Sequence, residues 1–187
     1  VEPAKGTVNP RVFIDRLAKK MPANVTVVAD VGQNQIWTCT EYKFRKEGRL
    51  LTSGGMGTMG YSVPAAIGAK MADNSRATVA ICGDGAFQMS FMELATAVQF
   101  GVDIKVVVMT NNRLGMVREL QTNGYHDRQT AVFLDGSPDF IKLAEAYGIP
   151  AMRVYDDDTM EKGVEMLAEH KGICLVEVVV DKDMPTL

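Results

Sequence analysis

Two apolar runs, each followed by a short polar turn, limit the folds open to this chain more than any other feature. The first run, Thr78–Cys82, leads into Gly83-Asp84-Gly85, and the second, Ile104–Met109, leads into Thr110-Asn111-Asn112. A helix is expected between them, from about Met89 to Phe100. A crossover of this length joins parallel strands, and neighbouring parallel strands finish at the same edge of a sheet. We therefore expect the aspartate and the asparagine pair to meet at that edge.

The residues that would meet there suit a metal ion and a phosphate group. A carboxylate and an amide carbonyl are hard oxygen ligands of the kind that magnesium and calcium prefer. Gly83 and Gly85 allow the backbone to approach a diphosphate, whose charge also favours the amino end of a helix. The pattern indicates a clamp for a metal and a diphosphate, while an ordinary turn with a capping aspartate explains the spacing equally well.

The rest of the chain continues the alternation of strands and helices. Apolar runs predict further strands at Val25–Ala29, Leu50–Thr52, Ala151–Tyr155 and Ile173–Val180. Helices are predicted from Pro10 onward with Asn9 as the cap, at Ser62–Ala72, at Asp139–Tyr147 with Ser137-Pro138 as the cap, and at Met160–His170. The predicted fold is a doubly wound, mainly parallel α/β domain of about six strands, with helices on both faces and the ligand at the carboxyl ends of the strands. The patterns leave the strand order open.

Length and composition fit one folded domain in a reducing compartment. A chain of 187 residues can bury a sizeable core, so we expect a single domain. We assign residues 9–187 to this domain and residues 1–8 to a linker remnant. The net charge of -3 provides no basic surface for nucleic acid, and no apolar run approaches membrane-spanning length. Cys39, Cys82 and Cys174 are far apart and match no zinc spacing, which favours reduced thiols in a cytoplasmic protein.

Three other features have a structural interpretation that is better than the functional one. Asp156-Asp157-Asp158 resembles a metal cluster, but it precedes a helix whose dipole favours negative charge, so we predict a cap. Trp37 is predicted to lie in the core or in an interface. His126 lies in a polar stretch, where a surface position is favoured over a role in substrate binding.

The Gly-Asp-Gly turn followed further along by Asn-Asn resembles the signature of thiamine-diphosphate enzymes. More segments are similar to the large subunit of acetolactate (acetohydroxyacid) synthase, and they lie at residues 30–37, 51–60, 64–69, 93–96, 114–117 and 139–148. The resemblance covers nearly the whole chain but only the carboxyl-terminal third of such an enzyme. It implies an excised part of a longer protein, without the pyrimidine-binding and FAD-binding domains.

The resemblance implies a magnesium ion that holds the diphosphate of the cofactor. Its ligands would be Asp84, Asn111 and the backbone carbonyl of Arg113, counted back from the Leu114-Gly115-Met116 motif. Asn112 is the alternative to Asn111. The cofactor-binding residues implied by the family are Gly32, Gln33, Asn34, Gly57, Met59, Gly83, Asp84, Gly85, Ala86, Asn111, Gly115 and Met116.

Individual roles also come from the resemblance. Gln33 and Asn34 match residues that contact the diphosphate, although the family usually has a histidine at the second place, and Asn34 cannot titrate. The carbonyl of Gly57 would accept a hydrogen bond from the 4′-amino group, and the Met59 side chain would support the bent cofactor. Without the resemblance, Met59 would count as flexible core filler.

The implied activity is decarboxylation of pyruvate on thiamine diphosphate and condensation of the two-carbon unit with a second pyruvate, or with 2-ketobutyrate, to give 2-acetolactate in branched-chain amino acid biosynthesis. No catalytic residue is expected in this chain, because the activating glutamate of the family lies in the amino-terminal domain. The chain alone is therefore expected to be inactive. FAD, a homodimer or tetramer and a small regulatory subunit are implied for the full-length enzyme.

Three alternatives stay open. The first is another thiamine-diphosphate decarboxylase or carboligase, because Leu120 stands where anabolic relatives commonly have tryptophan, in a region up to Asp135 that helps close the substrate channel in the family. The second is a nicotinamide enzyme, although the GxGxxG fingerprint is missing after the first strand. The third is a non-catalytic nucleotide-binding module.

Overall fold

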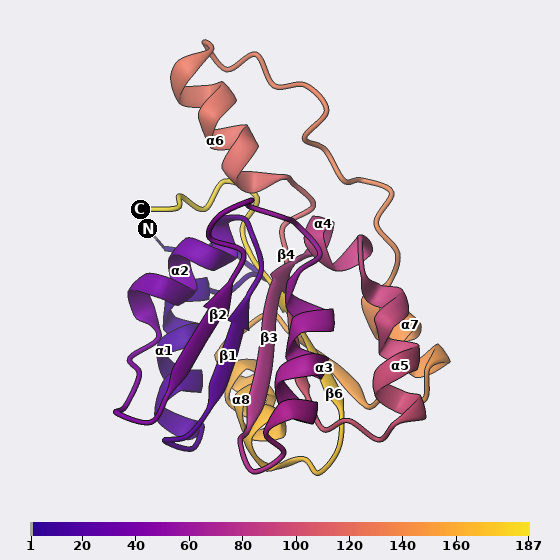
Figure 1. Cartoon of the computed structure of the whole chain (residues 1–187). Helices are drawn as coiled ribbons and strands as arrows, with labels where there is room; N and C mark the ends of the chain where they lie inside the picture. Colours follow the sequence, from indigo (N-terminus) through magenta and orange to yellow (C-terminus); the bar gives the residue numbers. More distant parts are fainter. Residues whose placement is uncertain (1) are drawn as a thin grey trace.

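A parallel sheet of six strands forms the centre of the computed structural model, which describes residues 2–187 and so leaves Val1 of the expected linker outside the described part. The strands are β1 Thr26–Ala29, β2 Arg49–Thr52, β3 Thr78–Gly83, β4 Lys105–Thr110, β5 Ala151–Val154 and β6 Cys174–Val179. Their order in the sheet is β2-β1-β3-β4-β6-β5 (Figure 1). The predicted fold class is confirmed, and every strand pair is parallel.

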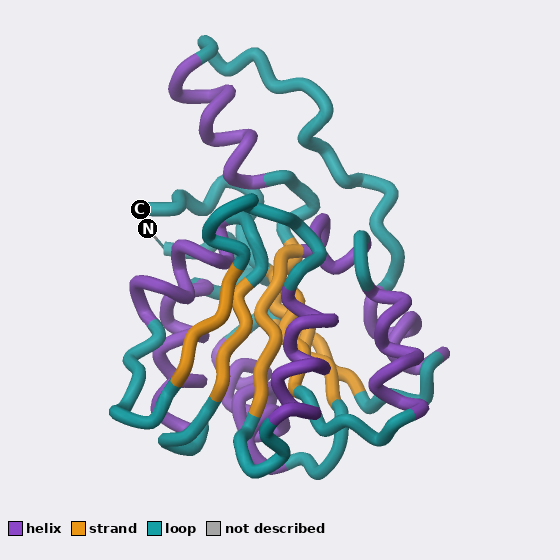
Figure 2. Tube along the Cα trace, viewed as in Figure 1, coloured by secondary structure: helices purple, strands orange, loops and turns teal. Residues whose placement is uncertain are grey.

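Helices cover both faces of this sheet (Figure 2). They are α1 Pro10–Lys20, α2 Gln33–Glu41, α3 Ser62–Ala72, α4 Asp84–Gln88, the 3-10 helix η1 Phe91–Glu93, α5 Leu94–Gln99, α6 Gly115–Gly124, α7 Phe140–Ala146 and α8 Asp157–Glu169. One buried cluster joins α1, α2 and α8 to the sheet, and a second joins α3, α5 and α7 to the opposite face. The sheet is therefore the middle of three layers.

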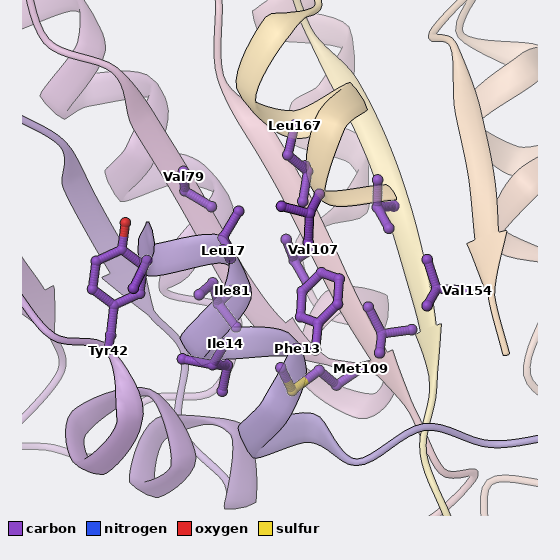
Figure 3. Close-up of a cluster of buried hydrophobic side chains, with 14 of the residues drawn as sticks. Phe13, Ile14, Leu17, Tyr42, Val79, Ile81, Val107, Met109, Val154 and Leu167 are labelled. Atoms are coloured by element: carbon purple, nitrogen blue, oxygen red, sulfur yellow. The ribbon is translucent and has the colours of Figure 1, made fainter. Parts of the chain in front are cut away.

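The central strands are mostly apolar because both of their faces are buried. Along β3, Val79 and Ile81 belong to the first cluster, whereas Ala80 and Cys82 belong to the second. Figure 3 shows the first cluster, in which Phe13 and Leu17 of α1 gather with Val107 of β4. Side chains alternate across a strand, so most positions of a strand covered on both sides are apolar. The buried Lys105 and Glu177 are exceptions, and each has a polar partner.

Two predicted helix caps are confirmed. The Asn9 side chain accepts a hydrogen bond from the backbone N–H of Arg11 at 3.0 Å, and Pro10 occupies the first position of α1. At the start of α8, Asp156 accepts from the N–H of Thr159 at 2.8 Å in a capping box. The acidic run therefore supplies the cap and the first turn of α8, as predicted. Among residues 2–187 no group of acidic, histidine or cysteine side chains is arranged to hold a metal.

The continuous helix expected from Met89 to Phe100 is wrong. The helical backbone begins at Asp84, directly after β3, and it is divided into α4, η1 and α5. The break lies at Ser90, whose φ of -143° and ψ of 10° are not helical. The N–H groups of Met89 and Ser90 donate to carbonyls only three residues back, a tighter turn that ends α4.

The expected cap Ser137-Pro138 is also wrong. Asp139 is the N-cap of α7, and its carboxylate accepts from the N–H of Ile141 at 3.1 Å. The hydroxyl of Ser137 donates instead to the Leu134 carbonyl at 2.8 Å. A carboxylate placed directly before the first turn binds its free N–H groups, which leaves Ser137 to the preceding loop.

The two ends of the chain meet near the carboxyl end of the sheet. Val8, in the segment assigned to a linker, is 3% exposed and pairs with Val180 in a parallel bridge. In contrast, α6 and the loop that follows it stand away from the body (Figure 1). Within the described residues, no helix combines the length and the apolar character needed to cross a membrane.

Candidate functional site

A cavity of about 110 Å³ opens where β1, β3 and β4 end. This is the edge at which the strand order changes direction, since β2 lies on one side of β1 and β3 lies on the other. Ligands of doubly wound sheets bind at this kind of switch point. The predicted residues that line the cavity are Gly32, Gln33, Asn34, Met59, Gly83, Asp84, Gly85, Ala86, Asn111, Arg113, Gly115 and Met116. Gly57 does not line it and lies in the exposed glycine loop with φ at +62°.

Asp84 is the most buried acidic group at this cavity, with 2% of its surface exposed. Its Oδ2 accepts from the backbone N–H groups of Asn112 at 2.7 Å and Asn111 at 3.2 Å, and its Oδ1 accepts from Gly85 at 2.9 Å. Burial raises the pKa of Asp84 to about 6 despite these hydrogen bonds. Across residues 2–187 no lysine or arginine forms an ion pair with it. A buried carboxylate without a cation is costly, and a bound metal ion would offset that cost.

The two asparagines after β4 differ in their surroundings. Asn111 lines the cavity, and its Oδ1 accepts from the N–H of Arg113 at 3.0 Å while its Nδ2 donates to Gln33 Oε1 at 3.1 Å. Asn112 has the left-handed φ of +54° and is exposed outside the cavity. The geometry therefore favours Asn111 as the amide ligand of the pair.

The side chain of Arg113 is held by other contacts, whereas its backbone carbonyl is free within the described residues. The guanidinium pairs with Asp135 at 3.0 Å and lies over the ring of Phe133, 4.6 Å from the ring centroid. In the described part of the chain its backbone carbonyl accepts no backbone hydrogen bond. A carboxylate, an amide oxygen and a free carbonyl are a donor set that fits a hard divalent cation such as magnesium.

Two glycines leave space that a side chain would fill. A Cβ at Gly115 would lie 1.9 Å from Gln33 Oε1, and one at Gly85 would lie 2.8 Å from Leu114 Cδ2. Both distances are shorter than any normal contact. The close approach of helix α6 to Gln33 therefore depends on glycine at position 115.

Gln33 and Asn34 lie at the cavity, but their amide N–H groups are already used. Asn34 Nδ2 donates to the carbonyls of Asp30 at 2.8 Å and Ile81 at 3.2 Å. Gln33 Nε2 donates to the Met184 carbonyl at 2.9 Å and to Thr186 Oγ1 at 3.1 Å. These two residues hold neighbouring segments together in this structure, whereas the family resemblance implied donation to a diphosphate.

Sequence reasoning did not single out Asp30 as a site residue. Its carboxylate is fully buried, and it accepts from the N–H groups of Gly60 at 3.0 Å and Ser62 at 2.8 Å. These bonds fasten the glycine loop, and with it Met59, to the end of β1. An aspartate directly after a buried strand was the available signal, because a buried carboxylate needs several donors.

Two other residues with proposed roles differ in position. Trp37 is 1% exposed, lines the cavity and donates its indole N–H to the Pro185 carbonyl at 3.1 Å, so it is a core residue as predicted. His126 lies at an exposed turn beyond α6, with φ at +53°, and does not line the cavity.

Comparisons with known proteins agree with this geometry. Residues 30–178 match the family described as "Thiamine pyrophosphate enzyme, C-terminal TPP binding domain". The chain is 39% identical over 97% of its length to a protein of Aspergillus candidus named "Acetolactate synthase catalytic subunit, mitochondrial", and covers 26% of that protein. It is 38% identical over 97% of its length to the "Acetolactate synthase large subunit" of Lactococcus lactis, and covers 31% of it. It is 34% identical over 91% of its length to the "Acetolactate synthase isozyme 2 large subunit" of Escherichia coli, and again covers 31%. The chain thus spans between a quarter and a third of these relatives.

Proposed function

The chain belongs to the thiamine pyrophosphate enzyme family, as a carboxyl-terminal domain that binds this cofactor, also called thiamine diphosphate, and we propose that it anchors the diphosphate through a magnesium ion. The observation that carries the proposal is the buried Asp84 carboxylate beside Asn111 at the cavity, with no cationic side chain paired to it in the described residues. Asp84, Asn111 and the Arg113 carbonyl would be the protein ligands. A hard divalent cation would balance the negative charge of this carboxylate and would also bind the negatively charged diphosphate.

The other cavity residues would shape the space for the cofactor. Gly83, Gly85 and Gly115 leave the backbone uncovered on the cavity wall, beside Ala86 and Met116. Met59 reaches the same cavity from the glycine loop, where it would support the bent cofactor, and Gly57 would bind the aminopyrimidine from further out. When bound, thiamine diphosphate supplies the electron sink for decarboxylation of a 2-keto acid and for transfer of the remaining two-carbon unit.

For the full-length enzyme we propose acetolactate synthase activity on pyruvate, in branched-chain amino acid biosynthesis. Support comes from identities of 34% to 39% to proteins with that name. The cavity of about 110 Å³ is well below the roughly 300 Å³ of a typical ligand site, which suggests that another part of the enzyme completes it. That part would supply the activating glutamate, and the FAD site would lie outside this chain.

The assembly and location are also proposed from the family. The rest of the large subunit would be the first partner, in a homodimer or tetramer, with a small regulatory subunit as a further partner. Cys39, Cys82 and Cys174 are all free thiols, which supports a reducing compartment, and we propose the cytoplasm.

The first experiment is calorimetric titration of the protein with thiamine diphosphate, with magnesium and then with a chelator. Binding that needs magnesium and is much tighter than binding of ATP is the expected result. Tight binding that is unchanged by the chelator would refute the metal site. Preferential binding of ATP would instead support a nucleotide-binding module.

The second experiment is on the full-length gene product, incubated with pyruvate, thiamine diphosphate and magnesium, with the products identified by NMR. Acetolactate is the expected product. Acetaldehyde alone would point to a different carboligase or decarboxylase. The 187-residue chain by itself is expected to form no acetolactate, and measurable formation would show that the activating carboxylate lies within it.

A further inference from the structure

We propose that Glu119 and Thr186 are positioning residues that set the orientation of the Asn111 amide through a directed series of hydrogen bonds. The series runs from Asn111 to Gln33, from Gln33 to Thr186, and from Thr186 to Glu119, and is called the amide relay below. It rests on the proposed function, because it matters only if Asn111 is a ligand of the cofactor metal. It connects that ligand to helix α6, which carries Glu119.

The direction of the relay is fixed at its Glu119 end. The Thr186 backbone N–H donates to Glu119 Oε1 at 2.7 Å, and the Thr186 hydroxyl donates to Oε2 of the same carboxylate. An ionised carboxylate only accepts hydrogen bonds, so the hydroxyl hydrogen must point at Glu119. The lone pairs of the hydroxyl oxygen are then available to an incoming donor.

Gln33 supplies that donor and is held in one orientation. Its Nε2 donates to Thr186 Oγ1 at 3.1 Å and to the Met184 carbonyl at 2.9 Å. Both partners are acceptors, so a flipped amide would place oxygen against oxygen in a side chain that is 4% exposed. Gln33 Oε1 must therefore face Asn111.

The last step orients the candidate metal ligand. Asn111 Nδ2 donates to Gln33 Oε1 at 3.1 Å, while Asn111 Oδ1 accepts from the Arg113 N–H at 3.0 Å. The two contacts hold the nitrogen toward Gln33 and the oxygen toward Arg113, whose carbonyl is another proposed ligand. The relay thus keeps the amide oxygen, the only atom of this side chain that can bind magnesium, on the proposed metal side.

Three contacts outside the relay hold the carboxyl-terminal segment, residues 181–187. Trp37 donates to the Pro185 carbonyl at 3.1 Å, Arg11 donates to the Thr186 carbonyl at 2.7 Å, and Arg118 pairs with Asp183 at 3.8 Å. The hydroxyl of Thr186 can therefore be removed without releasing the segment. This makes a clean test possible.

The test compares Thr186→Val, Thr186→Ser and Asp183→Asn in magnesium titrations of thiamine diphosphate binding. Thr186→Val removes the hydroxyl at nearly constant volume, and we expect the half-saturating magnesium concentration to rise about fivefold, as for one lost hydrogen bond. Thr186→Ser keeps the hydroxyl and should behave as the wild type. Asp183→Asn weakens a contact of the same segment outside the relay, and should change the value by less than about twofold.

Two outcomes of the titration would overturn the relay. One is an unchanged magnesium requirement in Thr186→Val. The other is an equal rise in Thr186→Val and Asp183→Asn, which would show that attachment of the segment matters and the amide relay does not. Thermal unfolding of each variant checks that the fold is intact.

A second readout separates the relay from the proposed function. In the metal-free protein, the Asn111 side-chain amide signals in a nitrogen-15 NMR spectrum should shift and exchange faster with solvent in Thr186→Val, and should not do so in Asp183→Asn. If the wild type fails to bind the cofactor with magnesium, the proposed function is wrong, and this readout still decides the relay. Unchanged Asn111 signals would refute it.

Discussion

The two strand-end turns and the projecting helix α6 lie next to each other, yet they are built in opposite ways. At the turns, Asp84 is 2% exposed and accepts three backbone hydrogen bonds. Helix α6 stands away from the body of the molecule (Figure 1). Leu120 on this helix is 61% exposed, and Tyr125 just beyond its end is 53% exposed. Backbone hydrogen bonds fix the position of the Asp84 carboxylate within this chain. The exposed apolar side chains of α6, in contrast, are not packed against another described part of the chain. The comparison separates the proposed anchor, whose metal ligands would all come from this chain, from the exposed surface of α6, for which we propose contact with the substrate in the full-length enzyme.

The sharpest test of the anchor compares two adjacent asparagines. Asn111→Ala should weaken magnesium-dependent binding of thiamine diphosphate by more than about a hundredfold, because it removes a proposed metal ligand. Mutation of a residue that only supports a metal ligand costs up to about a hundredfold in metal affinity, and loss of the ligand itself should cost at least as much. Asn112→Ala should weaken it less than about fivefold, because Asn112 is exposed outside the cavity and uses only its backbone. Calorimetry measures both, and the reverse order would show that Asn112 is the ligand.

The next test uses two glycines at opposite ends of α6. Gly115→Ala places a methyl group 1.9 Å from Gln33 Oε1, so it should lower the free energy of unfolding by about 1–3 kcal/mol and also weaken cofactor binding. Gly124→Ala meets nothing within 4 Å and should raise helix stability by up to about 1 kcal/mol. Urea unfolding of both variants measures the difference. Equal effects would mean that the contact between α6 and the anchor is not tight.

The buried carboxylate predicts a pH dependence of the metal-free protein. Burial raises the Asp84 pKa from 3.8 to about 6 in the folded state, so the fold is stabilised when this group is protonated. The stabilisation is fully present below about pH 4 and is lost as the pH rises through about 6, with a size on the order of 2–3 kcal/mol. The difference in unfolding free energy between wild type and Asp84→Asn should therefore change over this window. Magnesium should bind more weakly below pH 6, and a flat difference would contradict the burial.

The positions of Asp84 and Asn111 could be predicted from the sequence because the signals for them are local. A buried strand followed by a turn fixes where Asp84 and Asn111 lie once the strands are parallel, and both line the cavity. The strand order and the contact between Gln33 and Thr186 could not be predicted, because they depend on residues far apart in the chain. The broken helix after Asp84 was missed because apolar spacing does not reveal a single non-helical residue such as Ser90.

The smallest expected effect on cofactor binding is that of a substitution on the exposed surface of α6. Leu120→Ala should change cofactor binding by less than about twofold and leave the unfolding free energy within about 0.5 kcal/mol, because an exposed side chain loses little on truncation. In the full-length enzyme the same variant should change the ratio of products formed from mixed pyruvate and 2-ketobutyrate, measured by NMR. A strong loss of cofactor binding in Leu120→Ala would show that the exposed surface of α6 also belongs to the anchor, and would remove the division between the two regions. Leu120→Trp is the matched control, since it should alter the product ratio while leaving cofactor binding unchanged.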